Sequence, residues 1–472
     1  MAKYITTTLP YVNASPHLGH ALEFIQADAY VRTLRLQGEK VFFNTGVDEH
    51  GTKVWEKANE AGLEPQEYVD KLAVRFEQFA KELNMSYDAF TRTTSKAHQA
   101  AAQEFWKRCE ASGDIYKASY QVKYCVGCEL EKTDSELVDG KCPIHSNLEI
   151  QLIEEQNYYF RFSKYQEALL ELYKHNPLFV APEERLGEIR SFVEGGLKDF
   201  SISRRKEKLP WGVPVPGDDE QVMYVWFDAL VNYISVLGWP GDQTNFEAWW
   251  PAIQFAGKDN LRQQSAMWQA MLLSAGLPPS EQVFIHGFIT SGGQKMSKSL
   301  GNVIDPIALI ATYGVDVVRY VLLRHVSPFE DSDLTEENIR EAYTGNLVNG
   351  LGNLVARIMK LAEEHLDTPV NRPDAHSFSE EYIDGVKRFE FHKALDLIWK
   401  RIGELDERIT REEPFKVIKI DKEKGKEIIA EMATELYEIG RMLQPFMPAT
   451  SDTIKATVLA NKKPENLFPR LP

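Results

Sequence analysis

Apolar residues in the first hundred positions recur with two periods, one typical of strands and the other of helices. An alternating run starts at Tyr4 and ends at Pro10, and a compact apolar run covers Val41–Gly46. Apolar residues repeat at helical spacing in three further segments, Leu22–Leu34, Pro65–Leu83 and Ala97–Ala111. Strands that alternate with helices in this way predict a doubly wound, parallel α/β sheet.

The pattern changes twice in the rest of the chain. From about Ile115 to Lys208 it consists of cysteine-bearing turns and short strands, which indicate an insertion. Buried strands are then predicted at Val222–Phe227, Gln254–Gly257 and Val283–Gly287. Beyond Asn346, long amphipathic stretches predict a helix bundle. We therefore expect five segments: 1–114 and 209–300 as the two halves of a Rossmann-like domain, 115–208 as the insertion, 301–345 as a linking region and 346–472 as an all-α domain.

The charge balance is acidic, with 54 lysines and arginines against 70 aspartates and glutamates among 472 residues. This argues against a protein that coats nucleic acid, although a local basic surface can still bind a polyanion. No apolar run approaches the roughly 18 residues of a membrane span. The N-terminus has no signal-like segment, and four cysteines, three of them clustered, make no disulfide framework. We therefore expect a cytoplasmic protein that does not bind membranes.

The clustered cysteines have metal-ligand spacing. Cys125 and Cys128 form one CxxC pair, and after thirteen residues Cys142 and His145 form a CxxH pair. Two short pairs on separate turns can close a tetrahedral site, and thiolates with an imidazole favour Zn²⁺. Three unrelated thiols beside a surface histidine are the plainer alternative, while the second pair disfavours a redox CxxC. Because no ligand position is spare, we expect one structural zinc ion and no metal catalysis.

Two short motifs carry the chemistry. Pro16–His20 (PHLGH) stands at a strand-to-helix turn, and a helix N-terminus attracts anions. Lys295–Ser299 (KMSKS) follows the polar segment Ser291–Gln294, which looks flexible, and offers two lysines. Alone, the histidines could be helix caps or surface polarity, and the lysines part of a solvated linker. Together they can hold one polyphosphate from two points, which is what splitting ATP between its α- and β-phosphates needs.

The two motifs resemble the HIGH and KMSKS signatures of class I aminoacyl-tRNA synthetases, with Leu18 in place of the more frequent isoleucine. Four other segments are similar to methionyl-tRNA synthetases: Leu9–Asn13, Val47–Gly51, Trp226–Ala229 and Gly257–Asn260. The single knuckle with its CPxH half resembles one subgroup of that family, and the resemblance covers essentially the whole chain. The insertion, about 95 residues long, is too short for the hydrolytic editing domain of related synthetases.

The resemblance implies a methionine–tRNA ligase that works in two steps. The methionine carboxylate attacks the α-phosphorus of ATP, and the terminal ribose of the tRNA then takes the acyl group. The catalytic residues implied are His17, His20, Lys295 and Lys298. The ATP-binding residues implied are these four with Gly19, Asp259 and His286. Mg²⁺ would accompany ATP and bridge its oxygens, and Arg204 would reach over the adenylate.

The resemblance also implies a methionine pocket with aromatic and aliphatic walls, which suit a thioether. Its residues are Leu9, Tyr11, Asp48, Trp226, Ala229, Tyr233 and Gln264. Asp48 would pair with the substrate ammonium, although it could also cap its loop, and Trp226 and Tyr233 could be ordinary core residues. Gln264 departs from the family pattern, because many relatives have a histidine there. The sequence therefore leaves the polar edge of the pocket open.

By the same resemblance, the all-α domain reads the anticodon of methionine tRNA, initiator and elongator alike. Asn353 and Arg357 stand at i and i+4 on one helix face, and a plain solvated face is the alternative. Phe415 stands where the family usually has tryptophan, so it can stack on a base but lacks the indole donor. A monomer is expected, because no tRNA-binding OB-fold segment follows the bundle.

Two other functions fit part of the sequence. An HxGH nucleotidyltransferase would join a small phosphorylated substrate to AMP, but such enzymes are usually small single domains without a zinc insertion or a helical tail. A noncatalytic tRNA-binding relative would not need the two histidines and two lysines of the motifs, all of which are present. Both alternatives therefore explain less of the chain.

Overall fold

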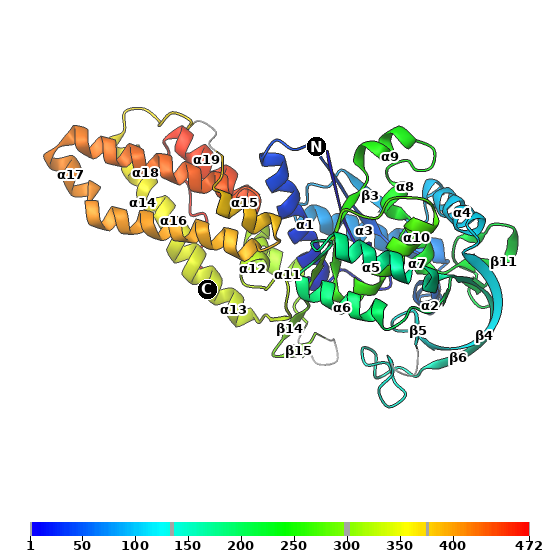
Figure 1. Ribbon diagram of the computed structural model, residues 1–472. Coiled ribbons are helices and arrows are strands. Elements are labelled where there is room, and N and C mark those ends of the chain that lie inside the picture. Colours follow the sequence, from blue (N-terminus) through cyan, green and yellow to red (C-terminus); the bar gives the residue numbers. More distant parts are fainter. Residues whose placement is uncertain (1, 133–135, 297–302, 374–376, 472) are drawn as a thin grey trace. The chain divides into compact units, whose positions relative to one another are not determined.

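The computed structural model describes residues 2–132, 136–296, 303–373 and 377–471 (Figure 1). The chain forms two compact units. The first consists of Met1–Pro16, Lys40–Ala80 and Tyr87–Ile285, and the second of His17–Glu39, Lys81–Ser86 and His286–Pro472. The five segments expected from the sequence divide the chain by role, and that division stays a prediction.

A six-stranded sheet with the order β3–β2–β1–β12–β13–β7 organises the first unit. Its strands are β1 (Lys3–Thr7), β2 (Val41–Val47), β3 (Ala89–Arg92), β7 (Val180–Ala181), β12 (Ala252–Gly257) and β13 (Gln282–His286). β1 pairs in parallel with both β2 and β12, β2 with β3, and β13 with β7. The predicted doubly wound sheet is confirmed. Its strand order reverses between β1 and β12, and open α/β sheets bind ligands beyond the carboxyl ends of the strands at such a reversal.

The helical patterns predicted after β2 become α3 (Pro65–Glu82) and α4 (Lys96–Ala111). The other helices of this unit are α2 (Thr52–Glu60), α5 (Gln166–His175), α6 (Glu183–Glu194), α7 (Val225–Ala229), α8 (Asn232–Ser235), α9 (Gln243–Trp249) and α10 (Trp268–Ser274). Phe105 of α4 packs its ring against Trp239 and Trp268, with centroids 5.9 and 5.5 Å apart. Large buried rings of this kind dominate core energetics, so they fix the helices that carry the site.

Two small antiparallel sheets are formed by parts of the insertion and by the residues that follow it. β4 (Ile115–Cys125) and β6 (Gln151–Phe160) form the long curved ribbon in Figure 1, flanked by β5 (Leu130–Lys132) and β8 (Phe200–Ser201). The second sheet has the order β10 (Pro214–Val215), β11 (Asp218–Met223) and β9 (Ser203–Arg205). The cysteine-bearing turns are present, but the expectation of short strands throughout this stretch is wrong. β4 and β6 are 11 and 10 residues long, and α5, β7 and α6 follow them, with β7 at the edge of the central sheet. Buried Leu186, Ile189 and Val193 have the spacing of a helix face in α6.

One strand prediction, Val222–Phe227, is wrong in its second half. β11 ends at Met223 and pairs antiparallel with β9, and α7 begins two residues later. The amides of Phe227 and Asp228 both donate to the carbonyl of Tyr224, at 2.9 and 3.1 Å, which closes the first helical turn. A six-residue apolar run can be buried equally well as strand or helix, so its pattern could not show where the strand stops.

The second unit contains α1 (Leu18–Leu36), which buries the predicted apolar positions from Leu22 to Leu34. Its later helices are α11 (Pro306–Tyr313), α12 (Val315–Arg324), α13 (Glu336–Ala342), α14 (Asn353–His365), α15 (Glu380–Lys387), α16 (Phe391–Glu412), α17 (Pro414–Ile420), α18 (Lys422–Leu443) and α19 (Pro448–Ala460). α18 packs against α14, α16, α17 and α19, in the yellow-to-red bundle of Figure 1. The all-α region predicted beyond residue 346 is confirmed.

Two segments are π-helical, Gln263–Met267 in the first unit and Tyr343–Gly352 in the second. Each runs directly into an α-helix, α10 in one case and α14 in the other. In a π-helix the hydrogen bonds run from i to i+5, and such segments occur frequently at functional sites. The first contains Gln264, and the second ends just before Asn353.

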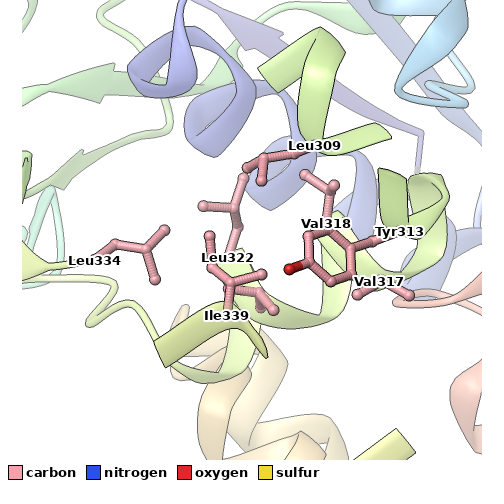
Figure 2. Close-up of a pocket in the computed structure, with 8 residues that line it drawn as sticks. Leu309, Tyr313, Val317, Val318, Leu322, Leu334 and Ile339 are labelled. Carbon is pink, nitrogen blue, oxygen red and sulfur yellow. The ribbon is translucent and has the colours of Figure 1, made fainter. Parts of the chain in front are cut away.

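No single helix among the described residues is long and apolar enough to cross a membrane. α11 and α12 pass that test only as a pair, and the pair is bent by 117°. An apolar pocket lies among α11, α12 and the following segment (Figure 2). It is lined by Leu309, Tyr313, Val317, Val318, Val321, Leu322, Leu334 and Ile339. None of these lining residues is charged, so the pocket offers little to orient a polar ligand.

Candidate active site and metal centre

The PHLGH motif forms the N-terminus of α1. His17 is the N-cap residue, and its Nδ1 accepts a hydrogen bond from the Gly19 amide at 3.1 Å. Nδ1 of His20 accepts in return from the His17 amide at 3.2 Å, and the two rings stack with centroids 3.7 Å apart. Both side chains of this capping box are therefore histidines. The capping role that the sequence left open is present.

Capping fixes the tautomer of these histidines. A ring nitrogen that accepts a hydrogen bond carries no proton, so a neutral imidazole bonded through Nδ1 has its proton on Nε2. The two nitrogens of each ring therefore have different tasks, because Nδ1 satisfies the helix and Nε2 is a donor. Capping and donation to a phosphate are compatible in the same side chain.

His286 lies in the same unit, at the end of β13. Its Nε2 is 3.2 Å from Oε2 of Glu23 on α1, and its Nδ1 is 2.8 Å from the carbonyl oxygen of Gly287. Burial lowers the pKa of His20 well below its ordinary value, and the charges of His17 and His286 lower it further. His20 is consequently neutral at pH 7, in the tautomer that its cap selects.

The second phosphate motif is only partly described. Lys298 lies outside the described residues, while the backbone of Lys295 belongs to β15 (Gln294–Lys295), opposite Thr290 of β14 (Ile289–Ser291). Gly292 and Gly293, with φ of 63° and 72°, make the two-residue turn between these strands. β14 also pairs with β16 (Ser332–Asp333). The segment that looked flexible from its composition is a tight hairpin.

Two expected methionine-binding residues, Tyr11 and Asp48, follow β1 and β2 at the carboxyl edge of the sheet. The amide of Val12 donates to the Asp48 carbonyl at 3.0 Å, and the Asp48 amide donates to the carbonyl of Pro10 at 2.9 Å. These bonds extend the parallel pairing by one bridge beyond the strands. The Tyr11 hydroxyl donates to Oε1 of Glu129 at 2.9 Å. The two loops are thus held together by their backbones.

Asp48 has the electrostatics of an ammonium-binding group. Its side chain is buried, and its Oδ1 has no hydrogen-bond partner among the described residues. Burial raises the pKa of this carboxyl well above its ordinary value, and the negative charges of Asp228 and Glu129 raise it further. A buried carboxylate without a cation costs free energy, which a bound ammonium would offset.

Most residues expected to form the apolar walls of the methionine pocket lie on helices that follow β11. Trp226 and Ala229 lie on α7 and Tyr233 lies on α8, while Leu9 follows β1 and is half-buried. Tyr233 also packs on Trp268, with ring centroids 6.0 Å apart, so it belongs to the core as well. Trp226 is half-buried, and its indole N–H has no acceptor among the described residues. The core role that the sequence left open is therefore real for Tyr233.

Gln264, at the expected polar edge of the methionine pocket, is hydrogen-bonded to neutral groups. Its Nε2 donates to the Tyr233 hydroxyl at 2.8 Å, and its Oε1 accepts from Nε2 of Gln254 at 3.2 Å. Gln254 is held in turn by the hydroxyl of Ser280, which donates to its Oε1 at 2.7 Å. This chain of bonds fixes which way the Gln264 amide points. Gln254 gave no signal in the sequence because it lies in an ordinary strand.

Sequence reasoning missed a buried carboxylate with two histidines. Asp228 of α7 lies 2.6 Å from Nδ1 of His50 and 2.7 Å from Nε2 of His98 on α4, and Nδ1 of His98 lies 3.1 Å from the Ser235 hydroxyl. Burial alone would raise the pKa of Asp228, but the histidines outweigh it and lower the pKa to about 2. The carboxylate therefore ties α7 to α4 and to the loop after β2. Asp228 and His50 lie in family-like segments, but nothing singled out His98.

The four expected metal ligands lie together in the insertion. One ligand atom from each of Cys125, Cys128, Cys142 and His145 lies within 4.8 Å of all the others. Nδ1 of His145 is 3.3 Å from Sγ of Cys128, and the Sγ atoms of Cys128 and Cys142 are 3.4 Å apart. These spacings fit the edges of a zinc tetrahedron with bonds of roughly 2.0–2.3 Å. Burial raises the pKa of the Cys128 thiol to about 12. A metal cation bound there would instead stabilise the thiolate.

Arg204 and Asp259 also lie in the first unit. Arg204 of β9 donates from Nη1 to the Ser201 hydroxyl at 2.8 Å, and its guanidinium lies 5.1 and 4.7 Å from the ring centroids of Tyr124 and Tyr224. Asp259 is exposed on the single turn that follows β12. It thus stands beyond the carboxyl end of a central strand, where doubly wound sheets bind nucleotides.

The expected anticodon residues lie on the bundle. Asn353 is the first residue of α14, and Arg357 follows one turn later, where Nη1 donates to Oδ1 of Asp406 on α16. Phe415 on α17 is 40% exposed, so its ring is open to contact from outside the bundle. Their role in binding the anticodon stays a prediction.

Comparisons with known proteins agree with this geometry. A family model described as tRNA synthetases class I (M) matches residues 3–150 and 146–359. The methionine–tRNA ligases of Thermosynechococcus vestitus and Thermotoga maritima are 42% and 39% identical, over 95% and 98% of this chain and 88% and 76% of theirs. A solved structure of Mycobacterium tuberculosis methionyl-tRNA synthetase in complex with methionyl-adenylate matches with a TM-score of 0.91 and 35% identity, covering 99% of this chain and 100% of that one. The chain therefore belongs to the class I tRNA synthetases for methionine, the methionine–tRNA ligases.

Proposed function

We propose that this methionine–tRNA ligase binds the ammonium group of methionine at Asp48 and the thioether between the walls described above. The observation that carries this assignment is the buried Oδ1 of Asp48, which has no hydrogen-bond partner among the described residues. Burial raises the pKa of this carboxyl, and the negative charges of Asp228 and Glu129 raise it further. An amino-acid ammonium supplies the missing charge. Gln264 and Tyr233 would meet the sulfur end with neutral polar groups.

Activation of methionine would use the PHLGH turn and the KMSKS lysines. The carboxylate of methionine attacks the α-phosphorus of ATP in line, and pyrophosphate leaves. Nε2–H of His17 and of His20 would donate to phosphate oxygens as charge develops there, which asks for donors rather than for proton transfer. Lys295 and Lys298 would neutralise the leaving pyrophosphate, and Asp259 would hold the ribose of ATP. Mg²⁺ bound with ATP would share the phosphate charge.

The insertion would hold one zinc ion through Cys125, Cys128, Cys142 and His145. Its chemistry would be structural, since three thiolates and an imidazole fill a tetrahedral shell. We expect one zinc per chain by elemental analysis of purified protein, and loss of that zinc in a Cys125→Ser/Cys142→Ser variant. Zinc that stays bound in the double variant would contradict this ligand set.

The second step would transfer methionine to the terminal adenosine of methionine tRNA, with Arg204 near the adenylate. The bundle would read the anticodon through Asn353, Arg357 and Phe415, because unpaired bases are read by stacking and edge hydrogen bonds. We further propose that both initiator and elongator tRNAs are substrates, and that the enzyme is a monomer in the cytoplasm.

Pyrophosphate exchange against all twenty amino acids tests this assignment. Methionine should drive exchange with ATP efficiently, and every other standard amino acid should do so at least about a hundredfold less well, as a pocket shaped for one side chain requires. Strong exchange with isoleucine or cysteine, and little with methionine, would overturn the assignment of the pocket. Because Gln264 and Tyr233 are neutral, methionine analogues altered at the sulfur provide a second series for the same assay.

A further inference from the structure

We propose that Glu129 is a positioning residue through which metal binding in the insertion sets the shape of the methionine pocket. Glu129 follows the metal ligand Cys128 directly, and its side chain points out of the insertion towards the loops after β1 and β2. The inference rests on the proposed function in one respect, namely that Tyr11 lines the methionine pocket.

Glu129 is a buried acid that bonds to distant parts of the chain. Only 4% of its surface is exposed. Its Oε1 accepts from the Tyr11 hydroxyl at 2.9 Å and from the amide of Lys53, in the first turn of α2, at 3.2 Å. One carboxylate oxygen therefore joins the loop after β1 to the helix after β2. Hydrogen bonds to a charged acceptor are stronger than those to a neutral one, so an ionised Glu129 would hold these two segments together strongly.

The backbone of residues 127–129, here called the knuckle turn, is also bonded to residues outside the insertion. Glu129 has a φ of 51°, a left-handed conformation that non-glycine residues adopt at a cost, so its surroundings must impose it. Its carbonyl accepts from the Tyr224 hydroxyl, and the carbonyl of Gly127 accepts from Nζ of Lys53. Gly127, between the two cysteines, and Glu129, directly after them, are thus bonded to Lys53 and Tyr224, which lie outside the insertion.

Two glycines show how closely the parts fit. A Cβ on Gly51, whose φ is 103°, would lie 2.3 Å from the Tyr11 hydroxyl oxygen and 3.0 Å from Oε2 of Glu129. A Cβ on Gly127 would lie 2.3 Å from the imidazole ring of His145, a metal ligand. The turn therefore packs on the metal site on one side and on the pocket loops on the other, with no slack at either contact.

The coupling follows from this geometry. Zinc fixes the position of the Cys128 sulfur and of the His145 ring, and through them the turn that carries Glu129. Without the metal the turn has fewer constraints, so Glu129 releases Tyr11 and the start of α2. The methionine pocket then loses the order of one wall, although no metal ligand touches the substrate.

Methionine binding without ATP tests the coupling, measured by equilibrium dialysis on the full chain. The variants are Glu129→Ala, Glu129→Gln, which keeps an acceptor oxygen, and Glu149→Ala, an exposed glutamate of the same insertion, as the matched control. We expect Glu129→Ala to retain its zinc and to raise the Kd for methionine about tenfold, the effect of losing one charged hydrogen bond. Glu129→Gln should lie between it and the wild type, and Glu149→Ala should match the wild type.

Removal of zinc by a chelator supplies the second arm. Chelation should raise the Kd of the wild type about as much as Glu129→Ala does, and should add less than about twofold to Glu129→Ala, because the two changes act through one contact. The proposal would be overturned if Glu129→Ala bound methionine with the Kd of the wild type. It would also be overturned if chelation raised the Kd of Glu129→Ala as much as it raises that of the wild type. If chelation unfolds the insertion, the zinc-loaded Glu129→Ala variant still decides.

Amide hydrogen exchange separates this proposal from the assignment of the pocket. In zinc-loaded Glu129→Ala, exchange at residues 9–13 and 48–57 should rise relative to the wild type and to Glu149→Ala, and unchanged exchange there would refute the coupling. A wild type that binds no methionine would instead contradict the proposed function, while the exchange result would still report on the contact between the knuckle turn and the pocket loops.

Discussion

The proposed methionine pocket and the proposed anticodon face of the bundle are built in opposite ways. Asp48 and Gln264 are buried, and the bonds that hold Gln264 reach Gln254 and Ser280 in other elements. Arg357 and Phe415 are partly exposed on regular helices. Substitutions in the pocket should therefore change stability and binding together, while substitutions on the bundle should change binding almost alone.

The largest expected effect is at Asp48. Asp48→Asn removes the charge that would pair with the methionine ammonium, so we expect kcat/KM for methionine in pyrophosphate exchange to fall about a thousandfold, the usual cost of breaking a buried ion pair. Methionyl-adenylate synthesis that survives within tenfold of the wild type would show that the ammonium binds elsewhere.

The same substitution should stabilise the ligand-free protein. The pKa of Asp48 is raised in the folded state, so between its unfolded and folded pKa values the native protein binds more protons and stability falls as pH rises. At pH 7 the raised pKa of Asp48 therefore costs free energy of folding, and asparagine avoids that cost. A higher Tm for Asp48→Asn without methionine, and no gain at pH 4, would establish that binding and stability are opposed in this pocket.

The KMSKS lysine should come next. Lys298→Ala is expected to depress pyrophosphate exchange about a hundredfold, as loss of one contact to transition-state charge does. Binding of ATP in the ground state should change less, because the lysine acts mainly as pyrophosphate charge develops. Unchanged exchange would remove the two-point phosphate clamp from the mechanism. Lys462→Ala, an exposed lysine on the bundle, is a suitable control.

On the bundle, Arg357→Ala should leave pyrophosphate exchange within twofold of the wild type and lower kcat/KM for tRNA aminoacylation about tenfold, the cost of one base contact. Asp406→Ala is the matched control, since it breaks the same ion pair but leaves the arginine in place, and exposed pairs contribute little stability. Equal losses of exchange and aminoacylation in Arg357→Ala would mean that the bundle is not a separate reader.

The smallest effect is expected at Phe415. Phe415→Trp adds an indole donor and a larger stacking face, so KM for methionine tRNA should fall about two- to threefold, a fraction of the roughly 1–3 kcal/mol that a whole base–aromatic contact contributes. Phe415→Leu should raise that KM. If both variants behave like the wild type in aminoacylation, the 40% exposed ring does not meet the anticodon.

Local patterns predicted most of the fold. Short apolar runs between turns predicted the parallel strands around residues 41–47, 252–257 and 282–286. Helical spacing of apolar residues predicted α1, α3 and α4. One exception was Val222–Phe227, where the apolar run spans the end of β11 and the start of α7. Periodicity cannot place a boundary inside an apolar run in which almost every residue is buried. The other exception was the insertion, where α5 and α6 stand in a stretch expected to hold short strands.

The candidate site was predictable where chemistry is local and hidden where it depends on long-range contacts. The spacing of the four Cys/His residues was enough to predict a metal cluster, which the structure assembles. Glu129 gave no signal, because its role appears only through Tyr11, 118 residues away. Nothing in the sequence indicated a role for His98 either, since a histidine on a helix has no distinctive pattern. Its role becomes visible only in its contact with Asp228.

If Gln264 lines the methionine pocket as proposed, the π-helical turn at Gln263–Met267 makes the number of residues in this segment a determinant of substrate choice. A π-turn holds one residue more than the α-turn that would replace it. Deleting a single residue there would therefore rotate the residues on one side of the deletion by about 100° around the helix axis. Gln264 would then leave the Tyr233 hydroxyl, or Trp268 would leave the core. Among relatives of this enzyme, single-residue gaps in this segment should mark changes of the pocket that no substitution matrix would reveal.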